Sequence, residues 1–435
     1  ITVFGLQAFM IETVIEEFGA TFFKVKKEKA IRKYKRRLSN IMGYDFDVKH
    51  IEALHDLGYL PIRVKALPEG VEIDPKIPSM TVINTLPEFY WVTNMLETII
   101  SSDTWIPMTS ASIAKQYRRI LTRAAKRTGT PLQFVDFQGH DFSMRGMCRQ
   151  AATLSGAGHA LSFVGSDTIP AIDFLEDYYY ADSDKEMILT SVPATEHSVM
   201  CMGGQETERD TFERLLKLYD SGVVSIVSDT WDFWKVMTEL APSLKEEIRA
   251  RKNIVGYNGE VIVPRKTVFR PDSGCPVKIL TGYVYEDTDT NDVYDGMSKY
   301  DIAAYLNGRK WKVEPEAIKM NGKYWDLEDL TKELQECEVK GAVETLWDEF
   351  GGFETVGTEG TFKQLDEVGL IYGDSITLER CQQICDRLEQ KGFASGNVVF
   401  GIGSFTYQYN TRDTYGFAIK ATWGQVNGVG RDIMK

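Results

Sequence analysis

The chain has 435 residues, of which 43% are hydrophobic and 26% charged, and its formal charge at pH 7 is −13. These values are typical of a globular protein with a large core, and the negative charge argues against nucleic acid or an anionic membrane as the main partner. No uninterrupted apolar stretch reaches the roughly 20 residues that a transmembrane helix needs. The six cysteines include no CxxC pair, so we expect reduced thiols and a cytoplasmic protein.

The first 130 residues mix amphipathic helix and strand. The apolar spacing predicts two helices and two strands, over residues 11–18, 113–125, 60–66 and 79–83 respectively. Basic clusters at residues 24–37 and 115–127 also have helical spacing, and we interpret them as solvated helix faces. Because the chain begins inside an apolar segment and ends just after a strand-like run, we expect further segments at both ends.

Seven short apolar runs follow, and each one ends abruptly in a polar, loop-like cluster. The runs are residues 132–141, 160–168, 187–198, 223–232, 266–274, 369–377 and 397–404. Each is rich in Val, Ile or Phe and is closed by Gly, Asp, Ser or Pro, which predicts a buried strand. Residues 206–219 and 377–391 have the spacing of crossover helices. We therefore predict a parallel (β/α) barrel over residues 133–406, with the polar run ends gathered on one face.

The alternation of strand and helix is interrupted at residues 280–342. This stretch is acidic and rich in Tyr and Trp, and its Asn307-Gly308 and Asn321-Gly322 pairs predict hairpin turns. We interpret it as a small subdomain inserted at the barrel rim. After residue 406 the chain is expected to pack against the N-terminal part, since residues 418–422 are strand-like.

Two of the five histidines lie at run ends, where a catalytic residue is expected. His140 follows Gly139 in the first run, and His197 belongs to SVPATEHS in the third. The alternative for each is a structural or solvated histidine. Asp229 and Asp232 close the fourth run and could hold Mg²⁺ through water, although an acidic helix N-terminus explains them equally well.

The last three runs carry groups suited to a phosphorylated sugar. Arg270 and Asp272 are two residues apart, so in an extended chain both point the same way, toward phosphate and toward sugar hydroxyls or a metal. A surface ion pair is the alternative. Gly373-Asp374-Ser375 and Gly401-Ile402-Gly403-Ser404 are typical of phosphate-cradling turns, although such turns are also common as simple chain reversals.

Taken in order, these motifs resemble those of a known family. HDFSMRG, GSDT, SVPATEHS, VSDTWD, FRPDSG, the GDS step and FGIGS follow one another as they do in the nicotinamide phosphoribosyltransferases, which are type II phosphoribosyltransferases. The likeness extends upstream through ALPEG at residues 66–70 and NTLPEFYWVTNMLET at residues 84–98. It covers nearly the whole chain except the insert.

The resemblance implies a fold and an activity. The fold is an irregular (β/α) barrel beside an α/β sandwich domain, here residues 1–132 with 407–435, in a homodimer with sites at its interface. The activity is the synthesis of nicotinamide mononucleotide and pyrophosphate from nicotinamide and phosphoribosyl pyrophosphate, for NAD salvage. Mg²⁺ is the implied cofactor, and ATP is implied to stimulate turnover by phosphorylating a histidine.

The resemblance also implies roles for individual residues. Phe142 would stack on the pyridine ring, Arg145 would contact substrate near ring and phosphate, and Asp167 would accept from the carboxamide. His197 would be the phosphorylated histidine. The residues that would bind phosphate, pyrophosphate and ribose are Arg270, Asp272, Ser225, Asp229, Gly373, Asp374, Gly403 and Ser404. Asp229 and Asp272 would also lie near Mg²⁺. Further cations would come from Arg412, Lys420 and Lys435, partly across the dimer.

Asp167 is the expected determinant of the base. A carboxylate accepts from an amide N–H but repels the carboxylate of nicotinate. The chain departs from the family pattern at Ser143, Met144 and Ser404, and it does not include the family's N-terminal segment. Two alternatives stay open: a nicotinate phosphoribosyltransferase, and a catalytically silent binding protein on the same fold.

Overall fold

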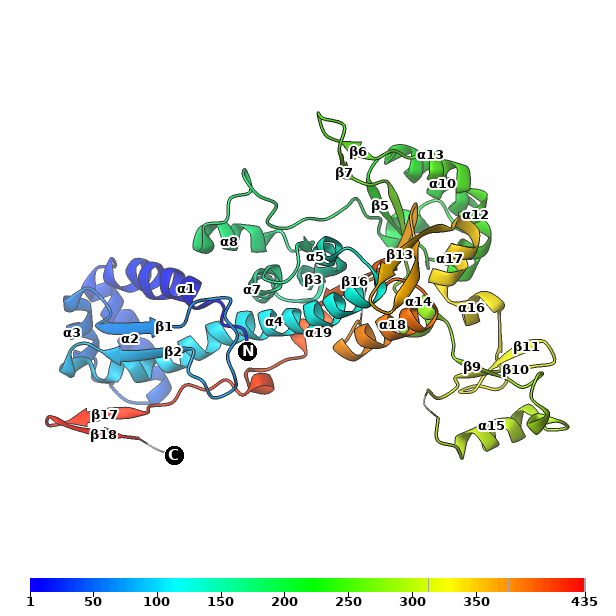
Figure 1. Cartoon of the computed structure of the whole chain (residues 1–435). Coiled ribbons are helices and arrows are strands. Elements are labelled where there is room, and N and C mark those ends of the chain that lie inside the picture. Colours follow the sequence, from blue (N-terminus) through cyan, green and yellow to red (C-terminus); the bar gives the residue numbers. More distant parts are fainter. Residues whose placement is uncertain (312, 374, 434–435) are drawn as a thin grey trace.

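The computed structural model describes residues 1–311, 313–373 and 375–433. Figure 1 shows an elongated molecule with an N-terminal unit at one end, a barrel at the other and the inserted subdomain projecting from the barrel. Helix α4, Trp91–Thr128, runs from the N-terminal unit into the barrel. In the described ranges, no helix is both long enough and apolar enough to cross a membrane.

Six parallel strands form the barrel sheet, in the order β4-β3-β16-β15-β8-β5. Their bounds are β3 Gly139–Phe142, β4 Gly165–Ser166, β5 Val223–Val227, β8 Lys266–Arg270, β15 Val368–Tyr372 and β16 Val398–Gly403. They are buried on both faces, which explains their continuous apolar runs. All six carboxyl ends lie at one edge of the sheet.

The third apolar run closes the sheet into a barrel, although it is not a regular strand. Thr190 forms a parallel bridge to Gly165 of β4, and Ala194 forms one to Ser225 of β5. Pro193 lies between the two bridges and lacks an N–H, so regular pairing is interrupted there. The barrel wall thus has seven segments, which we call staves: the six strands and the third apolar run. They follow one another around the barrel in chain order, and the predicted irregular (β/α) barrel is confirmed.

The other strand predictions differ from the structure in detail. Residues 132–138 of the first run are helical, in η4 Leu132–Phe134 and α5 Val135–Gln138, so strand β3 begins only at Gly139. Only two residues of the second run pair as β4. The predicted helix at residues 11–18 is a π-helix, η1 Met10–Glu17.

Helices cover the outside of the barrel and bury one large apolar cluster beneath them. They are α4, α10 Glu208–Leu218, α13 Lys245–Ala250, α14 Pro276–Thr281, α17 Ala342–Phe350 and α18 Leu378–Gln390. Helices α7 Arg149–Ala160 and α8 Pro170–Tyr179 contribute instead to a second, smaller cluster, which includes Phe4 and Ala8 of the N-terminal segment. The antiparallel pair β13 Gly352–Gly357 and β14 Gly360–Leu365 packs against the end of α4, where Thr355 Oγ1 donates to Thr128 O at 2.8 Å. The buried cluster includes Ile226, Phe269 and Phe400.

The N-terminal unit combines helices with a small antiparallel sheet. Its elements are α1 Leu6–Phe9, η2 Gly19–Phe23, α2 Lys27–Met42, α3 Lys49–Leu57, β1 Ile62–Ala66 and β2 Met80–Asn84. The C-terminal chain returns to this unit, where Ile419 packs against its apolar core. The strand-like run predicted at residues 418–422 is irregular, and the hairpin β17 Trp423–Val426 and β18 Val429–Asp432 follows it.

The insert has its own sheet and core. Strands β9 Tyr285–Asp287, β10 Ala317–Met320, β11 Lys323–Asp326 and β12 Glu333–Leu334 carry helix α15 Lys299–Asn307 on one side. Asn321 and Gly322 have φ values of 53° and 73° and make the predicted β10–β11 hairpin turn. Asn307-Gly308 instead ends α15. A bidentate ion pair of Arg387 with Glu316, at 2.7 and 2.8 Å, attaches the insert to α18.

Arg251 links the amino-terminal ends of β5 and β8 by hydrogen bonds. Its guanidinium is buried and donates to Tyr219 O at 2.8 Å, Gly222 O at 2.8 Å and Thr267 Oγ1 at 3.2 Å.

We expect Arg251→Met to lower the free energy of unfolding by about 2–4 kcal/mol, because each buried acceptor left without a donor costs about 1–3 kcal/mol. Urea denaturation measures this. Arg249→Met, which removes an exposed ion pair to Glu367, is the control and should cost less than about 1 kcal/mol.

Candidate active site

The stave ends bring together residues from β3, β4, the third stave, β5 and β8. Strand β3 supplies Phe142, and the following short helix α6, Ser143–Gly146, supplies Arg145. The buried Asp141 holds this turn: its carboxylate accepts from Ser143 N at 2.9 Å and from Ser166 Oγ at 3.1 Å. The ends of β3 and β4 are therefore fixed relative to each other.

A first cluster, formed by the Asp167 carboxylate and its hydrogen-bond donors, lies at the end of β4. Asp167 Oδ1 is 3.0 Å from His140 Nε2 and also accepts from the hydroxyl of Ser191. The His140 ring packs on Phe142 with 4.7 Å between centroids. Burial alone would raise the pKa of Asp167, but the hydrogen bonds from His140 and Ser191 and the charge of Arg270 hold that pKa below its ordinary value.

A second cluster joins the third stave to β5 and β8. His197 begins helix α9, His197–Cys201, and its Nε2 lies 3.3 Å from Asp229 Oδ1. The other oxygen of Asp229 accepts from Asp272 N at 2.9 Å and from Ser273 Oγ at 2.7 Å. Asp229 thus links the histidine to the loop after β8.

Arg270 is a buried cation that points into this cluster. Its side chain is 6% exposed, and it donates to Thr195 O at 2.8 Å. Its Nε lies 3.9 Å from Asp272 Oδ2, too far for a hydrogen bond. Burial and the nearby Asp229 raise the pKa of Asp272, while Arg270, His197 and Arg145 oppose that rise. The site therefore holds cations and carboxylates that do not fully satisfy one another.

Unsatisfied buried polar atoms gather here. Within the described ranges, four of the ten such side-chain atoms belong to the β5 and β8 ends: Ser225 Oγ, Thr230 Oγ1, Arg270 Nε and Asp272 Oδ1. A buried group without a partner costs about 1–3 kcal/mol, so such a cluster indicates a place where a polar ligand supplies the missing partners.

Two glycines of the predicted phosphate turns lie against the same residues. A methyl group at Gly373 would come within 2.2 Å of Asp272 Oδ1, and one at Gly403 within 3.3 Å of the Phe142 Cβ. Ser404 reaches toward Gly146, where an added methyl group would lie 2.2 Å from its Oγ. The last two staves therefore meet both clusters, and a side chain at residue 373 would displace the Asp272 carboxylate.

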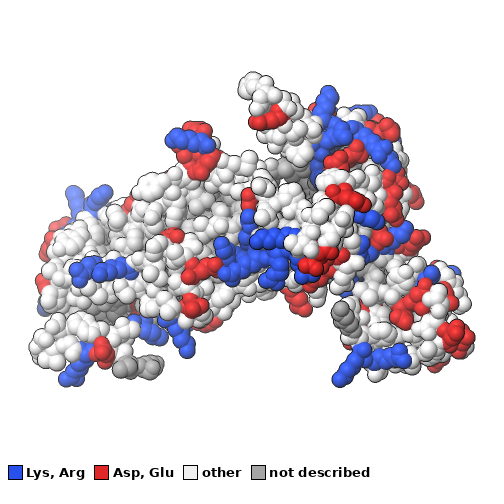
Figure 2. Space-filling model, viewed as in Figure 1, with Lys and Arg blue, Asp and Glu red and all other residues white. Residues whose placement is uncertain are grey.

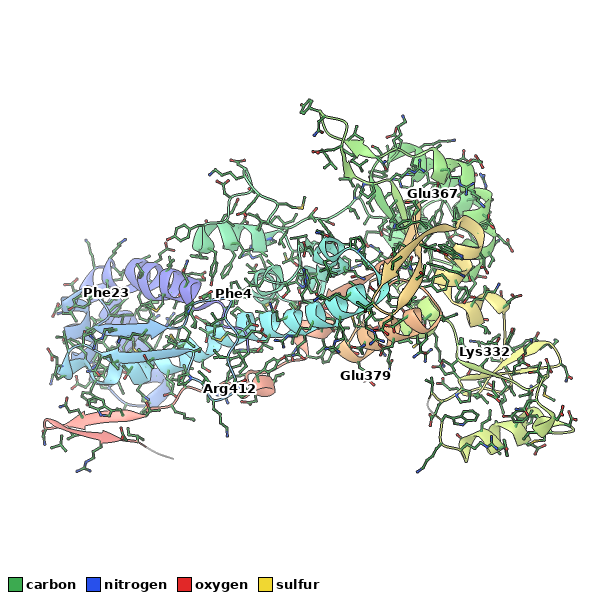
Figure 3. All side chains as sticks on the ribbon, viewed as in Figure 1. Phe4, Phe23, Lys332, Glu367, Glu379 and Arg412 are labelled. Carbon is green, nitrogen blue, oxygen red and sulfur yellow. The ribbon has the colours of Figure 1, made fainter. Side chains whose placement is uncertain are left out.

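Other predicted residues are placed elsewhere or cannot be placed. Arg412 pairs with its neighbour Asp413, and in Figure 3 it lies on the segment that leads back to the N-terminal unit. In the part of the chain that the structure describes, neither Arg412 nor Lys420 makes a hydrogen bond or ion pair with the stave-end residues. Asp374 and Lys435 lie outside the described residues. Their predicted roles, like those of the whole set, stay predictions.

Several site residues were not selected from the sequence. Thr195 holds Arg270, Glu196 pairs with Arg145 at 2.9 Å, and Ser191 bonds Asp167. All three lie in SVPATEHS, so the motif contained the signal, but only the histidine has a distinctive side chain. His140 was a candidate with a structural alternative, and its contact with Asp167 depends on the pairing of β3 with β4.

The donors present could hold a magnesium ion only together with a substrate. Among the described residues there is no group of three or more His, Cys, Asp or Glu side chains with metal-binding geometry. Asp229 and Asp272 offer two carboxylates, and Asp272 Oδ1 is unpartnered. Mg²⁺ commonly binds one or two carboxylates and completes its shell with substrate phosphates and water, so the pair fits that metal.

The fold and the site define a (β/α) barrel that gathers a buried arginine, several carboxylates and an aromatic ring at the carboxyl ends of its staves. Residues 137–435 match the model of the nicotinate phosphoribosyltransferase (NAPRTase) family. The chain belongs to this family.

Its relatives include enzymes named nicotinamide phosphoribosyltransferase. The one from Acinetobacter baylyi is 48% identical over 440 residues, covering 100% of this chain and 75% of its own. The one from Mycoplasma pneumoniae is 31% identical over 381 residues, covering 86% and 68%. A nicotinate-nucleotide pyrophosphorylase structure from Pyrococcus furiosus covers 80% of this chain and 58% of its own at 13% identity, and its TM-score of 0.40 is too low to support an argument.

Proposed function

We propose that the chain is a nicotinamide phosphoribosyltransferase that makes nicotinamide mononucleotide and pyrophosphate for NAD salvage. The observation that carries this proposal is the pairing of two clusters on one barrel face. Asp167 and Phe142 suit a pyridine carboxamide, and the buried Arg270 with Asp272 suits a phosphorylated sugar. Family membership and the names of the two relatives support the same reaction.

The reaction joins the pyridine nitrogen to C1′ of the ribose and breaks the bond from C1′ to pyrophosphate. Positive charge develops on the sugar, and negative charge grows on the leaving group. Arg270 and Arg145 would stabilise the leaving group, because preorganised cations act most strongly where charge develops in a water-poor site. Gly373, Gly403 and Ser404 would admit the 5′-phosphate to backbone N–H groups. Asp229 and Asp272 would hold Mg²⁺, which supplies further charge neutralisation of the pyrophosphate.

Base choice follows from Asp167. Its carboxylate accepts from the carboxamide N–H and repels a carboxylate at the same place, which favours nicotinamide over nicotinate. The low pKa keeps this group ionised. Nicotinate remains the alternative base because the family model carries its name.

The assay that tests the function supplies the purified chain with nicotinamide, phosphoribosyl pyrophosphate and Mg²⁺, with and without ATP, and measures pyrophosphate release. We expect release with nicotinamide and much less with nicotinate. Release with nicotinate alone would support the alternative enzyme. The absence of release with either base from the full-length protein would support a silent binding protein.

We further propose that ATP phosphorylates His197. Asp229 lies beside Nε2 and would orient the ring, so Nδ1 would attack the γ-phosphorus while ADP leaves. Incubation with γ-labelled ATP is expected to give an acid-labile label that is absent in His197→Ala. A label that persists in this variant would place the phosphoryl group elsewhere. His55→Ala is the control, because His55 bonds Val25 O in the N-terminal unit.

The remaining cations imply a second chain. Among the described residues, Arg412 and Lys420 make no hydrogen bond or ion pair with the stave ends of their own chain, so we propose that they serve the site of a partner in a homodimer. The six free thiols are in keeping with a cytoplasmic protein.

The pH dependence of nicotinamide use tests the charge on Asp167. Because the folded-state pKa lies below the ordinary carboxylate value, the ionised form is lost only as pH falls through that low pKa. We therefore expect the KM for nicotinamide to change less than about twofold between roughly pH 5.5 and 8. A tenfold rise in KM toward pH 5.5 would contradict an ionised Asp167.

A further inference from the structure

The imidazole of His140 touches both residues assigned to the pyridine base. Its Nε2 lies 3.0 Å from Asp167 Oδ1, and its ring packs on Phe142. The other side of the ring lies against β4, since a methyl group at Gly165 would come within 3.0 Å of Nδ1. His140 is 8% exposed. The ring is therefore clamped between β4, Phe142 and the carboxylate.

A second donor reaches the same carboxylate oxygen from another stave. Ser191 Oγ donates to Asp167 Oδ1, and the neighbouring Thr190 bridges β4. The backbone N–H of Asp167 donates to Asp141 O at 2.9 Å, so the main chain is fixed as well. Among the described residues, both hydrogen bonds that the Asp167 side chain accepts go to Oδ1. Oδ2 is thus the oxygen left to accept from a ligand.

We propose that His140 and Ser191 are positioning residues for base selection, which hold Asp167 so that Oδ2 meets the carboxamide N–H of the base. This inference rests on the proposed function and deepens it, because the choice between amide and carboxylate then depends on three residues. His140 also supports the face of Phe142, so the stacking plane and the accepting oxygen are set relative to each other.

The arrangement explains how one carboxylate can discriminate strongly. A carboxylate that can rotate, or that can bind a proton, accommodates nicotinate and loses selectivity. A carboxylate held by two donors keeps its charge and its direction, so nicotinate meets the full repulsion. Arg270 is a further charged group near Asp167, and it favours the ionised form too.

The test compares four variants by steady-state kinetics with both bases. Ser191→Ala removes one donor, and His140→Phe removes the other but keeps a ring on Phe142. Each is expected to raise the KM for nicotinamide about tenfold, the effect of one lost hydrogen bond, with kcat changed less than about threefold. The ratio of nicotinate to nicotinamide use should rise by a similar factor. His140→Gln, whose amide can still donate, should recover part of the loss.

Ser183→Ala is the matched control, because Ser183 also donates to a carboxylate, that of Glu176, on an exposed loop. It should leave both bases unchanged. Unaltered KM and base ratio in Ser191→Ala and His140→Phe would overturn the proposal. Ser191 is exposed, so Ser191→Ala should fold. If His140→Phe does not fold, the kinetics of Ser191→Ala alone test the proposal.

Failure of the proposed function would show differently, as absence of turnover in the unaltered chain. Calorimetric titration with nicotinamide then compares the same variants, and equal affinities would overturn the proposal.

Discussion

Replacing Arg270 by alanine is expected to lower kcat/KM for phosphoribosyl pyrophosphate about 10²- to 10³-fold, with most of the loss in kcat. The guanidinium is buried, already anchored by Thr195 O, and has an unpartnered Nε beside Asp272. A preorganised donor of this kind stabilises charge that grows on the leaving group, and the loss of one such donor costs about this factor. Steady-state kinetics of pyrophosphate release measures it.

Two companion variants separate catalysis from folding. Arg270→Lys keeps the charge but loses the planar fork, so we expect a smaller loss, about tenfold. Arg265→Ala removes an arginine just before the same strand, at the opposite end of the barrel, where it pairs with Glu367. Its kcat/KM should be unchanged. Equal losses in Arg265→Ala and Arg270→Ala would show that the effect comes from destabilising β8 rather than from the site.

The barrel could be predicted because each stave is a separate local signal. Buried parallel strands have continuous apolar runs, and the polar residues that end them mark one face. The seven runs therefore gave the number and order of staves. The third run shows the limit of this reasoning: Pro193 interrupts its pairing, so it closes the barrel through two isolated bridges rather than as a strand. Local apolarity does not reveal such irregular pairing.

Part of the site could be predicted from the sequence, because some of its residues have side chains with distinctive chemistry. Arg270, Asp272 and His197 stand out in their runs, and the structure brings them together with Asp229. Ser191 does not stand out, because a serine in a loop usually contacts solvent. Its role depends on the distance from the third stave to β4, which only the closed barrel sets. Figure 2 shows basic side chains gathered along α4, in agreement with the interpretation of residues 115–127 as a solvated helix face.

Replacing Asp167 by alanine is expected to weaken nicotinamide use and to narrow the preference against nicotinate. In the proposed function this carboxylate accepts one charge-assisted hydrogen bond from the base, worth about 1.5–3 kcal/mol, so kcat/KM for nicotinamide should fall roughly 10- to 150-fold. Nicotinate loses its repulsion at the same time, and its kcat/KM should hold or rise. Competition between the two bases, with product analysis, measures the ratio directly.

Two further variants show whether the charge or the shape of residue 167 determines the base preference. Asp167→Asn keeps the shape and an accepting oxygen but removes the charge. Its kcat/KM for nicotinamide should therefore fall less than that of Asp167→Ala, while the ratio of nicotinate to nicotinamide kcat/KM should rise as much. Asp173→Ala removes an exposed carboxylate from α8, six residues further along, and should change neither value. If Asp167→Ala and Asp167→Asn keep the original base ratio, the carboxylate does not select the base. His140 and Ser191, which act only through that carboxylate and Phe142, would then lose their proposed role as well.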